Sequence, residues 1–353
     1  MTHPVRYGGS LGAVGILLAS GIWAFAATQS EWQECTGNVS KNPDQSISAC
    51  SGIIAGSAEN EADRAKAYFN RGLAQYNKRE YDQSIADFDA AIKLTSNYPA
   101  AFAYRGSAWT KKGEFDRAIA DLTEAIKLNP TYRLAYLFRG HAYYDKFRIA
   151  HKDERALAIA DYSEVIKLDP KYVLGYSSRG FVHLSKSDYD RALPDCNQVI
   201  ELDPKHAEGY RCRGAAYRGK KDFDRAILDF NEAIKLNPTS AAYHSRGSCY
   251  HEKGDHDRSI ADFNEAIRLN PKDFDSFNRR GKAHAAKRDY NRAVADYTEA
   301  SKLNPKYVDA YNNRGAAYKL LGRKADAIAD FRKALSIDPA DKTAQQELKG
   351  LGG

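Results

Sequence analysis

The sequence lacks the short motifs by which many enzyme and metal sites are recognised. No P-loop or glycine-rich dinucleotide motif is present. The five cysteines include no Cys-x-x-Cys spacing, so a zinc site or a thioredoxin-like motif has no support. We therefore expect a protein that is not an enzyme and that has no cofactor, no bound metal and no small-molecule substrate.

Long apolar runs are also scarce, and the single one lies at the start of the chain. Arg6 is the only charged side chain among the first 27 residues, and residues 11–26 are apolar or small. Ala24 and Ala26 form an A-x-A pattern ahead of a polar stretch, which predicts a secretory signal peptide over 1–26, cleaved after Ala26. The alternative is an uncleaved anchor, because the run is only slightly shorter than the ~20 residues that span a bilayer.

Either interpretation takes the rest of the chain out of the cytosol. We expect a periplasmic or secreted protein of bacterial type, or alternatively one that is anchored in the inner membrane and faces the periplasm. The membrane is a partner only if the N-terminal segment stays uncleaved.

A long run of charge of one sign is missing as well. The formal net charge is +7, but basic and acidic residues are interleaved in nearly every segment. The balance supports no more than a mild preference for acidic partners. Some helical repeat proteins bind RNA, but the export signal argues against nucleic acid as a partner here.

What the sequence does contain is an internal repeat marked by the dipeptide Arg-Gly. Its arginines are Arg71, Arg105, Arg139, Arg179, Arg213, Arg246, Arg280 and Arg314. Most intervals are 34 residues long, and a period of this length indicates a helical solenoid. The units span residues 65–98, 99–132, 133–172, 173–206, 207–239, 240–273, 274–307 and 308–341.

Each unit predicts two helices. In the second unit, Phe102, Gly106 and Trp109 share one helix face at i, i+4 and i+7. Glycine inside a helix costs about 1 kcal/mol relative to alanine, so its repeated use indicates close approach of a second helix. That second helix carries a small, large, small pattern such as Ala118, Leu122 and Ala125.

The boundaries of the second helices are marked by polar residues and proline. Aspartates near the predicted start are placed to cap the helix and to meet its positive end. These are Asp116, Asp190, Asp224 and Asp257. An Asn-Pro or Asp-Pro pair then ends the second helix in all units but the first, which has Ser96 where proline is usual.

The arginine of each Arg-Gly dipeptide has an aspartate partner in the second helix of its unit. The spacing is sixteen residues, except in the third unit, which has six extra residues. A ligand-binding ladder is conceivable, but identical use in every unit favours a structural ion pair. The expected partners are Asp87, Asp121, Asp161, Asp195, Asp229, Asp262, Asp296 and Asp330.

Together, these motifs make the chain similar to the tetratricopeptide repeat family. The resemblance covers residues 65–341 and implies an all-α, right-handed superhelical solenoid of eight helix-turn-helix repeats. Residues 27–64 are expected to form a divergent N-terminal cap, and residues 342–353 a C-terminal capping helix and tail. The family's first helices line a concave groove that commonly receives an extended peptide or a partner helix.

The cysteines fall into two groups. Residues 44–50 parallel residues 82–88, which places Cys50 at the large core position of a degenerate second helix. A disulfide from Cys50 to Cys35 would close a loop of about 15 residues and contribute roughly 3 kcal/mol. The other three cysteines, Cys196, Cys212 and Cys249, are expected to be packed thiols.

Repeat positions 2, 5, 9 and 12 of the first helix lie opposite the packed stripe, and the resemblance assigns them to the groove. The early units offer apolar side chains and the later units basic ones. The expected groove residues are Phe69, Leu73, Tyr76, Leu137, His141, Tyr144, Phe181, Leu184, Arg211, Arg218, His244, His251, Lys282 and Lys319.

The sequence therefore predicts a protein–protein interaction scaffold or adaptor of the cell envelope. Its groove would bind a peptide or protein segment that carries apolar side chains toward one end and carboxylates toward the other. The alternative is a structural array without a groove ligand, which forms homo-oligomers through its terminal repeats.

Overall fold

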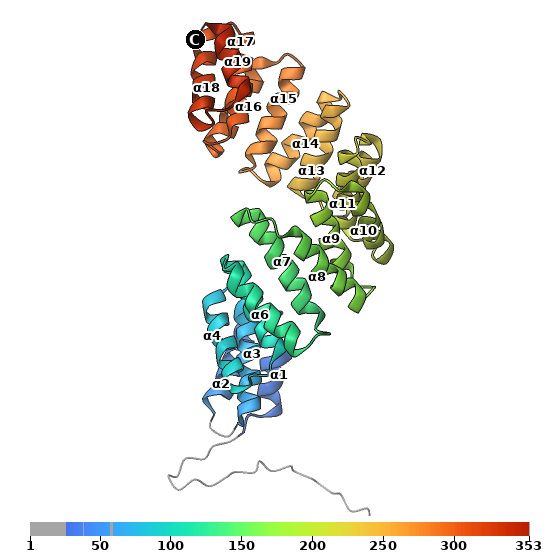
Figure 1. Ribbon diagram of the computed structural model, residues 1–353, viewed down its shortest axis with the longest axis vertical. Coiled ribbons are helices and arrows are strands. Elements are labelled where there is room, and N and C mark those ends of the chain that lie inside the picture. The colour runs from blue at the N-terminus through green and yellow to red at the C-terminus, as the bar shows by residue number, and fades with distance from the viewer. Residues whose placement is uncertain (1–25, 38, 57–58, 353) are drawn as a thin grey trace, which may run out of the picture. The chain divides into compact units, whose positions relative to one another are not determined.

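A computed structural model describes residues 26–37, 39–56 and 59–352, and these contain nineteen helices and no strand (Figure 1). Except for Ala26, the predicted signal peptide lies outside the described residues. The chain divides into two compact units, Met1–Gly175 and Tyr176–Gly353. The division falls within one helix, α9.

Unit 1 is a row of helices in which each helix packs on the next as far as α8. Helices α1 and α2 form the N-terminal cap, and α2 packs on α3 of the first repeat. The bounds are α1 Gln29–Gly37, α2 Pro43–Ala55, α3 Glu61–Asn77, α4 Tyr81–Leu94, α5 Pro99–Lys112, α6 Phe115–Leu128, α7 Arg133–Ala150 and α8 Arg155–Leu168. Helix α9, Val173–Ser185, then crosses the division.

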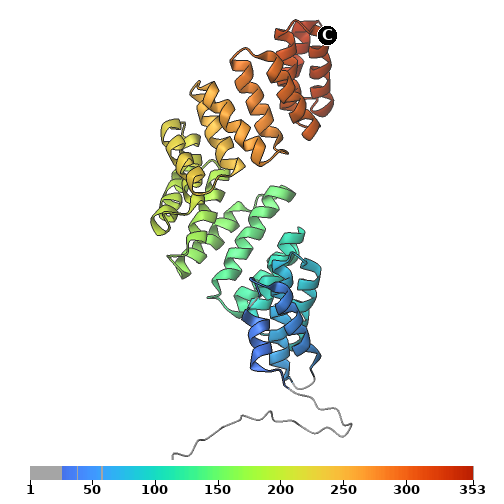
Figure 2. The same cartoon turned by 180° about the vertical axis from the view of Figure 1, so that it is seen from behind.

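Unit 2 repeats the same hairpins, as the view from behind also shows (Figure 2), and it ends in the predicted capping helix, α19, which packs on α18. The bounds are α10 Tyr189–Leu202, α11 Ala207–Gly219, α12 Phe223–Leu236, α13 Ser240–Glu252, α14 His256–Leu269, α15 Phe274–Ala286, α16 Tyr290–Leu303, α17 Val308–Leu320, α18 Lys324–Ile337 and α19 Lys342–Leu351. These hairpins confirm the predicted fold class.

The second helices are capped by different aspartates from those predicted. Asp222 precedes α12, and its side chain accepts a hydrogen bond from the backbone N–H of Arg225. Asp188, Asp255 and Asp289 do the same for α10, α14 and α16. The prediction that Asp224 and its equivalents are the caps is therefore wrong by two residues, since Asp224 lies in the first helical turn.

These first-turn aspartates instead link neighbouring repeats. Asp224 pairs with Lys253 at the end of the next repeat's first helix, and Asp116 pairs with Lys146 at 2.8 Å. Equivalent pairs join Asp190 to Lys220 and Asp257 to Lys287. Because the aspartates are about 80% exposed, each pair is expected to contribute less than about 1 kcal/mol.

The glycine of the Arg-Gly dipeptide lies directly against the large core residue of the second helix. A Cβ atom placed on Gly281 would lie 2.6 Å from Cε1 of Tyr297 and 2.9 Å from its Cδ1. Gly140 has the same relation to Tyr162, also at 2.6 Å. The close approach inferred from the sequence is therefore present, and it explains why a helix-weakening residue recurs in the first helices.

We expect Gly281→Ala to destabilise unit 2 by roughly 2 kcal/mol, because the added methyl group overpacks a ring that is only 2% exposed. Gly350→Ala in α19 of the same unit is the matched control, since no atom lies within 4 Å of its added Cβ. The control should stabilise the helix by up to about 1 kcal/mol. Urea unfolding midpoints compare the two variants, and a neutral Gly281→Ala would contradict this account.

The six extra residues of the third repeat lengthen its first helix and the turn that follows. Helix α7 has 18 residues, whereas α5 has 14. The guanidinium of Arg155, at the start of α8, lies 3.9 Å from the ring centroid of Phe147 near the end of α7. The insertion is thus folded back onto the repeat, although Ile149 remains 65% exposed.

The cysteine pattern differs from the predicted one in unit 2. Cys35 and Cys50 form a disulfide with sulfur atoms 2.05 Å apart, the pair expected from the sequence. Cys196 and Cys212, expected to be packed thiols, also form a disulfide, at 2.02 Å. Cys249 is a buried free thiol, and burial raises its pKa to about 12.

The second disulfide was missed because the two cysteines belong to different repeats. Cys196 lies in α10, the second helix of the fourth repeat, and Cys212 lies in α11, the first helix of the fifth. A second helix packs directly on the following first helix, so residues of adjacent repeats face each other. Sequence spacing alone does not show that Cys196 and Cys212 face each other across this junction.

Candidate functional site

The residues predicted to bind a partner lie on first helices, which also contact one another within each unit. Helix α5 contacts α3 and α7 in unit 1, and α11, α13, α15 and α17 form a corresponding series in unit 2. We call these two surfaces the first-helix faces. The face of unit 1 comprises Phe69, Leu73, Tyr76, Leu137, His141 and Tyr144, and that of unit 2 comprises Phe181, Leu184, Arg211, Arg218, His244, His251, Lys282 and Lys319.

The aromatic residues of α3 are half-buried because they pack on the next repeat. The ring of Phe69 lies 5.1 Å from that of Tyr98 and 5.8 Å from that of Tyr104. Tyr76 also contacts Tyr104, and its hydroxyl forms a 2.8 Å hydrogen bond with Ser107. These side chains stabilise the join between repeats and present only part of their surface to a partner.

The three face residues of α7 differ in accessibility. Leu137 is 3% exposed, so the prediction that it contacts a partner is wrong: its side chain belongs to the core. Burial lowers the pKa of His141 to about 4, so this imidazole is neutral at pH 7 and packs against Tyr162. Tyr144 is half-buried and stacks on Phe147, which leaves part of its ring accessible.

Several cations of unit 2 already have partners. Arg211 forms an ion pair with Glu208, and its guanidinium lies 4.6 Å from the ring centroid of Phe181. Lys319 lies 2.7 Å from a carboxylate oxygen of Glu347 in the capping helix. These contacts neutralise much of the positive charge that the sequence placed on this face.

The histidines of this face are held in a polar network. Nδ1 of His244 lies 2.8 Å from Ser276 Oγ, and Nε2 lies 3.3 Å from a carboxylate oxygen of Asp275. Asp275 in turn accepts hydrogen bonds from Arg279 and Tyr307, each at 3.0 Å.

Burial lowers the pKa of His244, and it also lowers that of His251, whose ring lies 5.1 Å from that of His256. The histidines therefore add no cationic charge at pH 7. The prediction that His244 and His251 contribute to a basic wall is wrong in this respect. Arg218 and Lys282 are half-buried, and neither has an ion pair among the residues described.

The arginine–aspartate pairs of the repeats are bidentate ion pairs between the two helices of a hairpin. In each pair, Nη2 of the arginine lies 2.6–2.8 Å from one carboxylate oxygen, and Nε donates to the other. The aspartate side chains are at most 13% exposed. These geometries agree with the structural role predicted for them.

A third contact of these arginines was missed from the sequence. Nη1 of Arg213 donates to Asn197 of the preceding repeat, and Nη1 of Arg105 donates to Asp89. In both cases the acceptor lies two residues after the paired aspartate of the preceding repeat. A polar residue at that position is therefore the sequence signal that could have predicted this contact. Arg71 makes the same contact with Ser51 of the N-terminal cap. The arginines therefore join consecutive repeats as well as the two helices of one hairpin.

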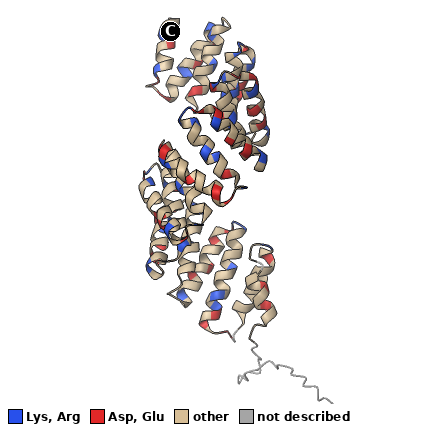
Figure 3. Cartoon of the chain, turned by 90° about the vertical axis from the view of Figure 1, so that its right-hand side faces the viewer, with Lys and Arg blue, Asp and Glu red and all other residues tan. Residues whose placement is uncertain are grey.

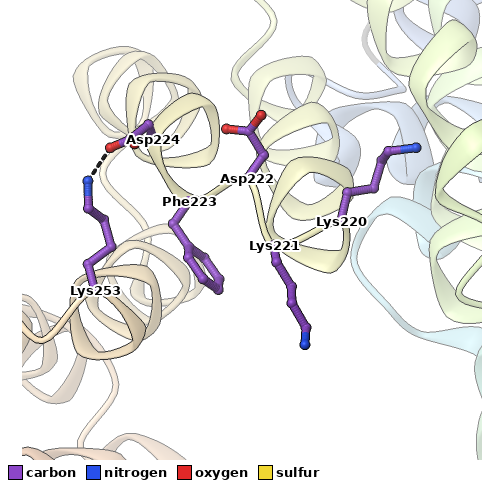
Figure 4. Close-up of a pocket in the computed structure, with 6 residues that line it drawn as sticks. All are labelled: Lys220, Lys221, Asp222, Phe223, Asp224 and Lys253. Atoms are coloured by element: carbon purple, nitrogen blue, oxygen red, sulfur yellow. Dashed lines mark hydrogen bonds and ion pairs between the residues drawn. The ribbon is translucent and has the colours of Figure 1, made fainter.

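Two cavities among the described residues lie at equivalent turns of two repeats. One of about 390 Å³ lies at the turn between α11 and α12, lined by Lys220, Lys221, Phe223 and Lys253 among others (Figure 4). A second, of about 370 Å³, lies at the equivalent turn between α5 and α6. Both contain the inter-repeat lysine–aspartate pair, so they are features of the repeat.

The described residues also contain no group of three His, Cys, Asp or Glu side chains placed to hold a metal ion. No helix within the described ranges has the length and apolar character needed to cross a bilayer. Basic and acidic residues are mixed along the helices visible in Figure 3, as the sequence suggested.

Comparison with known families agrees with the geometry of the hairpins. Tetratricopeptide repeat models match residues 65–98, 175–206, 207–240, 240–273 and 308–341. A further TPR repeat model matches residues 106–146 and 285–322. The chain belongs to the tetratricopeptide repeat family. This fold is that of a protein-interaction scaffold, and the family's repeats are generally non-enzymatic.

Solved structures support the tetratricopeptide fold. A chain of the APC/C hetero-tetramer Cut9–Hcn1 has 14% identity and a TM-score of 0.60. The match covers 89% of this chain and 60% of that one. A tetratricopeptide repeat protein from Parabacteroides merdae has 21% identity and a TM-score of 0.55, covering 72% of this chain and 99% of its own.

Pseudomonas aeruginosa pilF has 15% identity and a TM-score of 0.52 over 62% of this chain and 97% of its own. No curated protein matches the tetratricopeptide chain described here. At these levels of identity the likenesses establish the fold alone.

Proposed function

We propose that this chain is an extracytoplasmic scaffold that binds an extended segment of another protein along its first-helix faces. One observation carries the proposal. The Arg-Gly dipeptides and the arginine–aspartate pairs of the hairpins recur in every unit, whereas the residues of the first-helix faces change from repeat to repeat. A surface that recognises a particular sequence needs side chains that differ along its length, and these positions provide them.

The chemistry of the accessible positions suggests the partner. In unit 1 the half-buried Leu73 and Tyr144 offer apolar surface, and in unit 2 the half-buried Arg218 and Lys282 offer positive charge. Apolar anchors contribute most to the lifetime of a complex, while unpaired cations at the rim mainly accelerate association. A segment that carries both apolar residues and carboxylates fits the apolar surface of unit 1 and the positive charge of unit 2.

The cysteines support a location outside the cytosol. Two disulfides, Cys35–Cys50 and Cys196–Cys212, are compatible with an oxidising compartment. Together with the predicted signal peptide, they favour a periplasmic or secreted protein. The inner-membrane-anchored form remains the alternative.

Self-association is the second candidate function. It is favoured by Leu320, which is 62% exposed at the end of α17, near the C-terminal cap. Large exposed leucines at a terminal repeat provide surface that another copy can cover. Sedimentation of the purified protein over a range of concentrations tests this candidate directly.

Site-specific photocrosslinking in the exporting cell tests the groove proposal. A photoreactive amino acid replaces Leu73 or Lys282 on the first-helix faces, or Leu228 on second helix α12, which is 65% exposed and serves as the control. We expect the first two positions to crosslink to the same heterologous protein and Leu228 not to. Crosslinks from Leu228 alone, or only to further copies of the chain, would contradict the proposal.

Binding kinetics to the captured segment should separate the two chemistries. Tyr144→Ala is expected to raise the dissociation rate about tenfold, whereas Arg218→Ala with Lys282→Ala should lower the association rate and its salt dependence. Lys167→Ala with Lys235→Ala, on the second helices α8 and α12, is the charge-matched control because both side chains are 74% exposed. Surface plasmon resonance at two salt concentrations measures all of these rates. Unchanged rates in the folded variants would move the contact to another face.

A further inference from the structure

The first described residues of the chain are attached to the N-terminal cap. The backbone N–H of Ala27 donates to Oε1 of Glu59 at 2.6 Å, across 32 residues of sequence. Ala27 is half-buried and packs on the apolar cluster that contains Cys35, Cys50 and Ile53. Ala26, one residue earlier, is exposed. The nitrogen and the methyl group of Ala27 are thus both held in place.

The residues that follow fix the direction of this attachment. Oγ1 of Thr28 accepts a hydrogen bond from the N–H of Glu31, and Glu31 accepts one from the N–H of Thr28 at 2.7 Å. This reciprocal arrangement is a capping box, and it starts α1 at Gln29. Because Thr28 is fixed by the helix start, the position of the Ala27 nitrogen is set by the cap.

The surroundings of that nitrogen are acidic and incompletely neutralised. A cavity of about 210 Å³ is lined by residues 26–28 and by Glu31, Gly52, Ile53, Gly56 and Glu59. It contains two carboxylates and no lysine or arginine. No ion pair involves Glu31 or Glu59 among the residues described. An amide N–H supplies one proton and no charge, so this site lacks a cation.

We propose that the cavity at Glu59 is the receptor for a new N-terminus, generated by hydrolysis of the Ala26–Ala27 peptide bond. An external endopeptidase of the signal-peptidase class would add water across the bond. Ala26 would leave with a carboxylate, and the Ala27 nitrogen would take up protons to become an ammonium group.

The fit follows from the chemistry of that group. An α-amino group has an ordinary pKa near 8 and is charged at neutral pH. It keeps the hydrogen bond to Glu59 that the amide makes, adds the missing positive charge, and gains two further donors. Loss of Ala26 opens the cavity beside it. Proteolytic processing would therefore complete the N-terminal cap, and Glu59 is the residue that recognises its product.

The first test is the N-terminus of the exported protein. The full chain is expressed in an exporting bacterium, and the purified product is analysed by intact-mass measurement and N-terminal sequencing. We expect Ala27 to be the first residue. Any other N-terminus, including an unprocessed one, would overturn the proposal.

The second test measures the environment of the amine. Chains that begin at Ala27, released from a cleavable fusion, are labelled with an amine-reactive reagent at several pH values, and the Ala27 peptide is quantified by mass spectrometry. Pairing with Glu59 should raise the pKa of the amine by about one unit, so labelling near pH 7 should be about tenfold slower than in a chain that begins at Ala26.

Glu59→Gln should remove that difference, whereas Glu61→Gln, an exposed neighbour in α3, should not. Circular dichroism and retention of the Cys35–Cys50 disulfide verify that the variants are folded. Equal labelling rates for the two starting residues, or a rate unchanged by Glu59→Gln, would overturn the assignment of Glu59. None of these results depends on whether the first-helix faces bind a partner.

Discussion

Replacing Asp229 by alanine is expected to lower the free energy of unfolding of unit 2 by about 3 kcal/mol. Its carboxylate accepts hydrogen bonds from Nε and Nη2 of Arg213 at 2.9 and 2.8 Å, and the residue is 5% exposed. Without it, the guanidinium retains Asn197 but no carboxylate. Removing one partner of a buried pair costs about 3–5 kcal/mol. We expect a cost at the lower end of this range because the Arg213 side chain is 26% exposed, so water stabilises part of the unpaired charge.

The control for this experiment is the exposed aspartate of the same repeat. Asp224 pairs with Lys253 while remaining 80% exposed, so Asp224→Ala should cost less than about 1 kcal/mol. The double variant Arg213→Met with Asp229→Leu should be more stable than Asp229→Ala, because neither charge is left unpaired. Urea unfolding of the three proteins measures the differences.

Equal destabilisation by Asp229→Ala and Asp224→Ala would show that burial of the pair is unimportant. Partner binding should be unchanged wherever the Asp229→Ala protein remains folded. A stable Asp229→Ala protein that has lost its partner would instead identify the ladder as a recognition site.

The fold was predictable because one packing problem recurs in every repeat. The Arg-Gly dipeptide placed a glycine opposite a large core residue, and the structure shows why no side chain fits there: a Cβ on Gly140 would meet the ring of Tyr162. The spacing of sixteen residues likewise identified the partners of the arginines. Both signals come from contacts within one hairpin, where sequence separation fixes spatial proximity.

Contacts between repeats were harder to predict from the same sequence. The bond from Arg213 to Asn197 and the Cys196–Cys212 disulfide both join the second helix of one repeat to the first helix of the next. The residues that cap the second helices were predicted wrongly for a different reason. Asp222 and Asp224 are both acidic residues near a helix start, and only the backbone geometry shows that the first of them is the cap.

The candidate site was predicted least well, because sequence position does not reveal accessibility. Leu137 and Tyr144 both satisfy the repeat rule for the first-helix face, yet Leu137 is buried and Tyr144 is partly accessible. Charge is equally ambiguous, since Arg211 is paired with Glu208, three residues earlier on the same helix. The positions available to a partner are those whose side chains are neither buried against neighbouring helices nor held in ion pairs.

The Cys196–Cys212 disulfide occupies a place that other repeats fill with a large side chain. Cys196 stands at the position of Phe230 in the next repeat, and both cysteines are fully buried. A Cβ on Gly180 would lie 3.1 Å from the sulfur of Cys212, whereas one on Gly214 would meet the ring of Phe230 at 3.0 Å. The sulfur atoms thus fill core volume and also crosslink two adjacent repeats.

Cys196→Ala with Cys212→Ala should therefore destabilise unit 2 by about 4 kcal/mol. Loss of a crosslink between residues 16 apart accounts for about 3 kcal/mol, and the small cavity left behind adds to it. Cys196→Phe with Cys212→Ala should recover about 1 kcal/mol, because the ring restores the volume but not the crosslink. Urea unfolding under oxidising conditions measures both variants.

Reduction provides an independent test of the crosslink. In dithiothreitol, the free energy of unfolding of the wild-type protein should approach that of a Cys196→Ser, Cys212→Ser variant. Dithiothreitol should lower the stability of that variant only by reducing its remaining Cys35–Cys50 disulfide. Because both sulfurs are fully buried, reduction in the absence of urea should be slow and should accelerate as unit 2 opens. If mass spectrometry of the exported, unreduced protein recovers Cys196 and Cys212 as free thiols, the crosslink is absent and these residues only fill the core.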